Sequence, residues 1–138
     1  METIYIIKNT VTGRTYVGRT CGDVERRFNQ HLQKLRTGNH NEVMQRDYDK
    51  YGEESFVVHP FATIDDRWEV GRMEAFMQVL LRSKERKYGY NYLDAIGTSE
   101  RAKFEKWRTN PWGWFHSLSK RQKAQFEEQM KRISSMRS

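Results

Sequence analysis

Five side chains of this 138-residue chain could act together in chemistry, although they lie far apart in the sequence. Tyr5 and Tyr16 stand eleven residues apart, each within a short apolar run, and Arg27 and His31 have the four-residue offset of one helix face. Glu74 has apolar neighbours, where a carboxylate needs a specific reason. Phenol, imidazole and carboxylate groups exchange protons and arginine binds anions, so the five could form one active site. Alternatively, the tyrosines are half-buried sheet residues and Arg27 is a surface residue.

The elements that must position these residues mix strands and helices. Residues 2–8 are rich in β-branched and aromatic types and predict a strand, which pairs with residues 14–18 across a turn. Asp23 can cap a helix over residues 24–35, where apolar residues recur every three or four positions. The remaining predicted elements of this part are a helix over residues 42–50, a strand over residues 55–61 in which Pro60 suggests an edge or an end, and a long helix opened by Asp65 or Asp66 that runs to about Lys87.

The last 38 residues carry all of the excess positive charge. Residues 1–100 hold 15 Lys and Arg against 15 Asp and Glu, whereas residues 101–138 hold 10 against 3. This segment suits a polyanion, most commonly a nucleic acid, and a solvated helical tail is the alternative. The change in character predicts a domain over residues 1–97 and a basic, Trp-rich helical extension over residues 98–138. Ser119 and Gln122 have capping-box spacing and should begin its last helix.

Composition also excludes several classes of protein. The single cysteine, Cys21, rules out an internal disulfide and a four-cysteine zinc site. No apolar run approaches the length of a membrane span, and the first residues lack a signal-peptide pattern. We therefore expect a cytoplasmic protein that does not enter a membrane.

Six short motifs resemble those of the GIY-YIG nuclease family, and within it the nuclease module of phage homing endonucleases. TIY and YVG resemble the two motifs that name the family, although Thr3 replaces the first glycine, a position that matters mainly for its backbone. The motifs ERRFNQH, GNH, RMEAF and GYN follow in the family's order at similar distances, at residues 25–31, 38–40, 72–76 and 89–91. The resemblance covers about residues 2–95.

The resemblance implies a fold and a site. The fold is α/β (α+β), with a small three-stranded antiparallel sheet flanked by helices and the basic extension appended. Arg26 competes with Arg27 for the catalytic arginine, and the offset to His31 together with the helical phase of Phe28 favours Arg27. The implied catalytic residues are Tyr5, Tyr16, Arg27, His31, His40 and Glu74, with Gly18 and Asn91 supporting the site.

The implied reaction is metal-dependent hydrolysis of a DNA phosphodiester, and the residue types suit it. Arginine binds phosphate oxygens in pairs and keeps its charge. A lone Glu74 can hold one Mg²⁺, or Mn²⁺, whose other ligands are waters and a phosphate oxygen. Tyr5 is implied as the general base, which requires help because a free phenol has a pKa of about 10. Tyr16, His31 and His40 would orient water and phosphate.

The basic residues outside this set are expected to bind DNA phosphates. The tryptophans Trp107, Trp112 and Trp114 could stack on bases or pack on the core, and we expect at least two of them to pack. The predicted DNA-binding residues are Arg26, Lys103, Lys106, Arg108, Lys120, Arg121 and Lys123.

Three functions remain open at this level. The first is an endonuclease of a phage or mobile element, of the homing or genome-interference type, acting on double-stranded DNA in the bacterial cytoplasm. The second is a DNA-binding module that has lost cutting, and the third is a DNA-repair nuclease subunit. A site with one metal ion cuts one strand per visit, so the protein could nick as a monomer or break both strands as a transient dimer.

Overall fold

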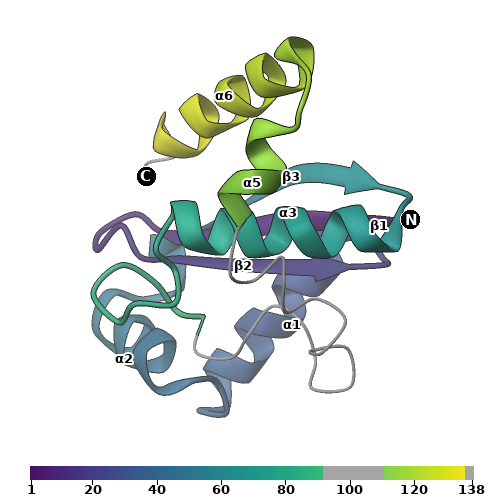
Figure 1. Ribbon diagram of the computed structural model, residues 1–138. Helices are drawn as coiled ribbons and strands as arrows, with labels where there is room; N and C mark the ends of the chain where they lie inside the picture. Colours follow the sequence, from purple (N-terminus) through teal and green to yellow (C-terminus); the bar gives the residue numbers. More distant parts are fainter. Residues whose placement is uncertain (92–110, 136–138) are drawn as a thin grey trace.

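A three-stranded antiparallel sheet with helices on both faces forms the centre of the molecule (Figure 1). The computed structural model describes residues 1–91 and 111–135. The strands β1 (Glu2–Asn9), β2 (Thr15–Thr20) and β3 (Phe56–Ile64) lie in the order β2-β1-β3, so β1 is central. The predicted fold class is confirmed.

The helices begin where the sequence provides a cap. Asp23, Asn41 and Asp66 each accept a hydrogen bond from a backbone N–H in the first turn of the following helix. Ser119 and Gln122 form the predicted capping box at 3.2 and 2.9 Å. No described helix is both long and apolar enough to span a bilayer. The helical elements are α1 (Val24–Arg36), α2 (Glu42–Tyr51), the short 3₁₀ turn η1 (Glu53–Ser55), α3 (Arg67–Leu80), α5 (Pro111–His116) and α6 (Lys120–Ser135).

The alternation of side chains along β1 divides the interior into two cores. Ile4 and Ile6 point to one face, where they pack with α3 and α6. Tyr5 and Ile7 point to the other face, where they pack with α1 and α2. All four side chains are at most 1% exposed, so the central strand is buried on both sides.

The C-terminal helices share one core with the sheet and α3. Phe126 of α6 is 7% exposed. The centroid of its ring lies 5.5 Å from that of Phe61 on β3, 5.1 Å from that of Phe76 on α3 and 5.3 Å from that of Phe115 on α5. These aromatic contacts hold α5 and α6 against α3, on the face of the sheet opposite α1 and α2 (Figure 1). The predicted boundary between residues 97 and 98 lies outside the described residues.

One of the three C-terminal tryptophans can be placed. Trp112 meets the ring of Phe76 edge-on at 5.0 Å and remains 43% exposed. This tryptophan therefore packs on the core with one part of its ring. Trp107 and the side chain of Trp114 lie outside the described part of the chain.

Helix α3 is shorter than predicted, because it ends at Leu80 and not near Lys87. Arg82 adopts a left-handed conformation with φ of 55°, and the N–H of Ser83 bonds to the carbonyl of Gln78 at 3.0 Å. This is a Schellman ending, which usually has glycine where Arg82 stands. The sequence therefore showed no stop signal, and the prediction was wrong by almost two turns.

The third strand is an edge strand, as Pro60 suggested. It runs three residues beyond the predicted end, to Ile64, and Pro60 lies opposite Tyr5, beside an irregularity in the pairing with β1. Proline lacks an N–H, which an edge strand tolerates because no strand pairs with its outer side in the described part of the chain.

We expect Phe126→Ala to lower the free energy of unfolding by about 3 kcal/mol, because it removes a buried ring that touches three elements. Gln125→Ala, an exposed position one residue earlier on α6, is the control and should change the stability by less than about 0.5 kcal/mol. Urea unfolding monitored by circular dichroism measures both. Equal stability of the two variants would show that α6 does not contribute to the core.

Candidate active site

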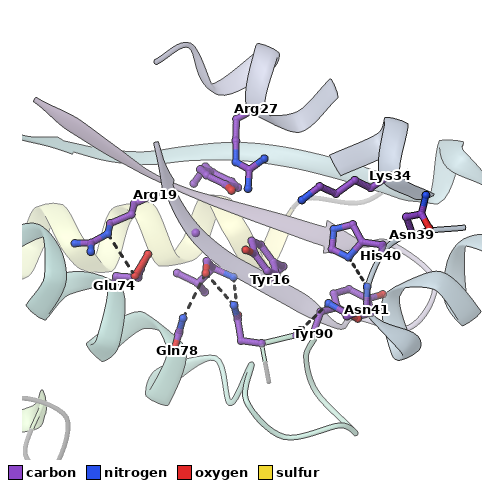
Figure 2. A pocket seen from close by; sticks show the side chains of 14 residues that line it. Tyr16, Arg19, Arg27, Lys34, Asn39, His40, Asn41, Glu74, Gln78 and Tyr90 are labelled. Carbon is purple, nitrogen blue, oxygen red and sulfur yellow. Dashed lines mark hydrogen bonds and ion pairs between the residues drawn. The ribbon is translucent and has the colours of Figure 1, made fainter. Parts of the chain in front are cut away.

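A pocket of about 440 Å³ lies along β2, an outer strand of the sheet, and the predicted residues gather around it (Figure 2). Figure 2 shows Arg27 reaching in from α1, Glu74 from α3 and His40 from the loop before α2. Of the predicted catalytic residues, all except His31 line the pocket, and His31 lies directly behind Tyr5. The structure thus brings together groups from both faces of the sheet.

Gly18 makes room for the phenol of Tyr5. The two residues are directly paired between β1 and β2. A Cβ atom on Gly18 would come within 2.5 Å of the Tyr5 hydroxyl and within 2.8 Å of the Tyr16 ring. Any other residue at this position would displace the two tyrosines, so the glycine sets where both phenols lie.

The hydroxyl of Tyr5 begins a buried chain of polar contacts. It lies 2.8 Å from Nε2 of His31, and Nδ1 of His31 lies 2.8 Å from Nε2 of His40. The ring of His31 also contacts the edge of Tyr16 at 4.9 Å between centroids. The two tyrosines and two histidines therefore form one packed group, which fixes the position of each ring.

Burial controls the protonation of the tyrosines. It raises the pKa of Tyr5 above its usual range, with a further contribution from Tyr16, while the positive charge of Arg27 opposes the shift. Burial likewise raises the pKa of Tyr16, again opposed by Arg27. Arg27 is thus the nearby group that favours a phenolate in this pocket.

The structure distinguishes the two neighbouring arginines. Arg27 is half-buried and lines the pocket, and its Nη1 donates to Gln30 at 3.0 Å. Arg26 is exposed and is not among the residues that line the pocket. The helical phase of Phe28 and His31 correctly indicated which arginine faces inward.

Glu74 is a buried carboxylate with an unused oxygen. It is 3% exposed, and its Oε1 accepts no hydrogen bond from any residue that the structure describes. Nε of Arg19 lies 3.8 Å from the same atom, too far for a hydrogen bond. Burial raises the pKa of Glu74 to about 8, although Arg19 opposes the shift. A bound cation would satisfy this oxygen and stabilise the ionised form.

The surroundings of Glu74 fit one hydrated divalent ion better than a closed metal cage. Within residues 1–91 and 111–135, no three His, Cys, Asp or Glu side chains are grouped to hold a metal. Mg²⁺ binds in such places through one or two carboxylates and keeps several waters. Glu74 is the acidic residue among those that line the pocket, and its buried Oε1 atom has no hydrogen-bond partner among the described residues.

The side chain of Asn91 binds the backbone of β2. Its side-chain oxygen accepts the N–H of Val17 at 2.8 Å, and its side-chain nitrogen donates to the carbonyl of Val17 at 3.0 Å. Gln78 of α3 also reaches this carbonyl, at 3.4 Å. The Asn91 side chain therefore binds β2, beside the pocket that both residues line.

Sequence reasoning missed five polar residues of the pocket. Two of them had a visible signal in the sequence. Lys34 follows Arg27 by seven residues, which is two turns along the same helix face. Arg19 follows Gly18 in the strand, so its side chain points to the other face of the sheet, towards α3. The others depend on tertiary contacts that no local pattern reports. The missed residues are Arg19, Lys34, Asn39, Asn41 and Gln78.

The predicted DNA-binding residues lie away from this pocket where they are described. Lys120 and Arg121 are exposed on α6, and Lys123 lies 5.8 Å from the ring of Phe115. None of these three is among the described residues that line the pocket. Lys103, Lys106 and Arg108 lie outside the described residues.

Comparisons with known proteins agree with this geometry. The sequence family described as the GIY-YIG catalytic domain matches residues 1–91 of this chain. An alanine mutant of the catalytic domain of intron endonuclease I-TevI is 32% identical, with a TM-score of 0.60 over 70% of this chain and 98% of its own. A structure of the catalytic domain of homing endonuclease I-TevI is 31% identical, with a TM-score of 0.58 over 68% of this chain and 100% of its own. No curated protein sequence matches the chain.

We expect Gly18→Ala to destabilise the protein by about 1–3 kcal/mol, because the new methyl group overlaps the Tyr5 hydroxyl. Gly22→Ala is the matched control, since its Cβ would come no closer than 3.9 Å to Thr20. Thermal unfolding of the two variants and the wild type measures the effect. Equal melting temperatures for the two variants would contradict the close approach of Gly18 and Tyr5.

We also expect Glu74→Gln to stabilise the metal-free protein increasingly as the pH rises. The folded protein holds the Glu74 proton with a pKa of about 8, against 4.5 for an ordinary glutamate. Ionisation therefore favours the unfolded chain, and the wild type loses stability relative to the variant between these two pKa values. Urea unfolding with a chelator at pH 5, 7 and 8.5 measures the difference. A difference that does not change with pH would show that Glu74 ionises normally.

Proposed function

The chain belongs to the GIY-YIG nuclease family and is a DNA endonuclease, and we propose that it hydrolyses the phosphodiester bond with one divalent cation held by Glu74. The pocket is the observation that carries the proposal. A guanidinium, a phenol and a carboxylate line the same pocket, and one oxygen of the carboxylate is buried without a hydrogen-bond partner among the described residues. Phosphodiester hydrolysis requires cationic stabilisation of the phosphate, a group that handles the proton of water, and charge near the leaving oxygen.

Arg27 is proposed to stabilise the transition state. Its planar fork can bind two phosphate oxygens and remains charged at every relevant pH. Lys34 lines the same pocket two turns further along α1, so it offers a second cation to the phosphate or its neighbour. Both groups are in place before substrate binds, which lowers the reorganisation needed during the reaction.

Glu74 would hold the cation, with Mg²⁺ proposed and Mn²⁺ as the alternative. A divalent ion bound here would supply charge to the phosphate and to the leaving oxygen. The unused Oε1 atom supports this role, as does the small number of acidic side chains around it. Arg19, 3.8 Å from Glu74, favours the ionised carboxylate that would hold the cation.

Tyr5 is proposed to handle the proton of the attacking water. Its hydroxyl is buried in the pocket wall and is held by His31 at 2.8 Å. Arg27 favours the phenolate against the opposing effect of burial. Tyr16, His31 and His40 are proposed to orient Tyr5, water and phosphate, which their mutual ring contacts support.

The substrate is proposed to be double-stranded DNA that contacts both the pocket and the basic extension. Lys120 and Arg121 of α6 are exposed, and Figure 1 shows α6 on the far side of the sheet from α1. The two regions would thus bind separate stretches of phosphate backbone. Binding through several lysines and arginines would weaken steeply with salt.

We further propose that the protein serves a phage or a mobile element as a homing or genome-interference nuclease. The similarity to the catalytic domain of a homing endonuclease supports this proposal. A pocket with one carboxylate suits the cutting of one strand per visit, so a monomer would nick and a transient dimer would break both strands.

Supercoiled plasmid incubated with the protein and Mg²⁺ tests the proposed mechanism. We expect open-circular or linear product with the wild type, and none with EDTA. Arg27→Ala should lower the cleavage rate at least about 100-fold, because it removes the cation that faces the phosphate. Glu74→Ala should do the same through loss of the cation site.

Arg26→Ala is the matched control for Arg27→Ala, because it removes the same charge from the exposed neighbour. Because Arg26 is a predicted DNA-binding residue, the variant should bind DNA more weakly but cleave saturating DNA within a few-fold of the wild-type rate. Equal losses in the two arginine variants would overturn the assignment of Arg27. Salt-sensitive DNA binding without cutting of plasmid or phage DNA would instead indicate a binding module.

A further inference from the structure

A continuous chain of three short contacts runs from a backbone amide to the Tyr5 hydroxyl. The N–H of Asn41 donates to Nδ1 of His40 at 2.8 Å. Nε2 of His40 lies 2.8 Å from Nδ1 of His31, and Nε2 of His31 lies 2.8 Å from the Tyr5 oxygen. Each ring nitrogen of both histidines therefore has a partner within hydrogen-bond distance.

The backbone amide permits a single arrangement of protons along this chain. A neutral imidazole has one N–H and one acceptor nitrogen, and a backbone amide can only donate. Nδ1 of His40 must therefore be an acceptor, which places the proton of His40 on Nε2. This N–H donates to Nδ1 of His31, so the proton of His31 also lies on Nε2 and points at Tyr5. The reverse arrangement would direct the N–H of Asn41 at an N–H of His40.

We infer that the backbone N–H of Asn41 sets the direction of proton donation through His40 and His31, so that His31 donates to Tyr5 and cannot accept its proton. The catalytic meaning of this inference rests on the proposed nuclease function, whereas the proton arrangement itself does not. Asn41 is thus a positioning residue, which acts through two histidines on the phenol.

The environment of the two rings supports neutral histidines. Burial, Arg27, His40 and Lys34 lower the pKa of His31 to about 3. Burial, Lys34 and Arg27 lower the pKa of His40 to about 4. Both rings therefore hold one proton at neutral pH, which is the condition that the donor and acceptor count requires.

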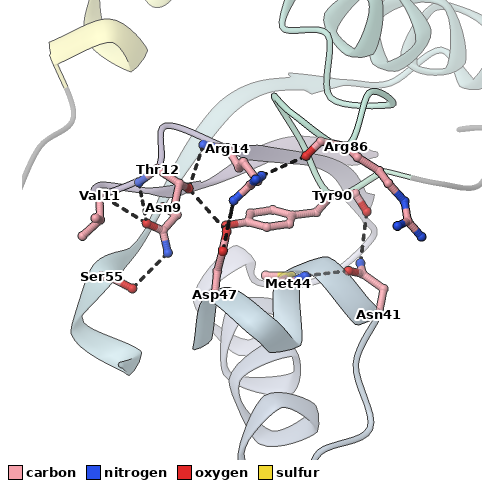
Figure 3. Close-up of polar contacts among 10 residues, drawn as sticks. All are labelled: Asn9, Val11, Thr12, Arg14, Asn41, Met44, Asp47, Ser55, Arg86 and Tyr90. Carbon is pink, nitrogen blue, oxygen red and sulfur yellow. Dashed lines mark hydrogen bonds and ion pairs between the residues drawn. The ribbon is translucent and has the colours of Figure 1, made fainter. Parts of the chain in front are cut away.

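The rest of the fold holds the Asn41 amide in place (Figure 3). The side chain of Asn41 accepts the N–H of Met44 at 2.9 Å and donates to the carbonyl of Tyr90 at 3.0 Å. The hydroxyl of Tyr90 donates to Asp47 at 2.6 Å, and Arg14 pairs with the same carboxylate. The loop that carries His40 is therefore tied to α2 and to the backbone of Tyr90.

The arrangement has a consequence for Tyr5. His31 occupies one side of the phenolic oxygen as a donor, so the phenolic proton lies on another side. Tyr5 and Tyr16 both line the pocket and their hydroxyls interact, so the phenol can donate to Tyr16 or into the pocket. A phenolate formed at Tyr5 would accept the N–H of His31, which stabilises the negative charge.

Nitrogen-15 NMR of the histidine side chains in the wild-type protein at neutral pH tests the inference. We expect Nε2 of both His31 and His40 to show the protonated shift and Nδ1 of both to show the unprotonated shift. His59→Gln and His116→Gln variants identify the remaining two rings. A proton on Nδ1 of either His31 or His40 would overturn the inference, whether or not the protein cuts DNA.

Two substitutions of Asn41 test its effect on the reaction. Asn41→Pro removes the amide N–H at a φ of −63°, which proline adopts, while Asn41→Ala removes the same side-chain contacts and keeps the N–H. We expect at least tenfold slower plasmid cleavage by the proline variant than by the alanine variant, with loss of the fixed Nε2–H form of His40. Two folded variants with equal cleavage and unchanged histidine spectra would overturn the inference. If the wild type shows the expected spectra but cuts no DNA, the nuclease mechanism fails and the proton arrangement stands.

Discussion

A buried phenol in the central strand is the constraint on which the rest of the structure depends. Tyr5 is 1% exposed, so its hydroxyl must find hydrogen-bond partners inside the protein. Gly18 leaves the space in which this hydroxyl lies, and His31 supplies the partner. His31 in turn requires His40, whose loop is held by Asn41 at the start of α2. One polar atom in β1 thereby fixes the relation of the hairpin, α1 and α2.

The place of the site follows from the division of the interior into two cores. Tyr5 belongs to the core shared with α1 and α2, whereas Glu74 comes from α3 on the other face. Groups from opposite faces of a sheet can meet beside an outer strand, and β2 is the outer strand next to β1. Arg27 and Arg19 reach the pocket from the two sides of this strand. An anionic substrate at the edge would therefore contact both layers at once.

The sequence predicted what local patterns determine and missed what tertiary contacts determine. The hairpin, the caps at Asp23 and Asp66, and the inward direction of Arg27 all follow from spacing within one element. The end of α3 was missed because Arg82 occupies a position that glycine usually marks. The role of Asn41 could not be predicted from its residue type, because the group that binds His40 is the backbone N–H of Asn41. Backbone groups carry no signature in the residue type.

The two hydrogen bonds between the Asn91 side chain and the Val17 backbone also affect how another strand could pair with the sheet. An outer strand normally offers alternating N–H and C=O groups to which a strand of another chain can add. At Val17 both groups are occupied by one amide side chain, which imitates a neighbouring strand over a single residue. The outer edge of β2 is therefore already occupied at Val17, so a strand of another chain could not pair with it at this residue.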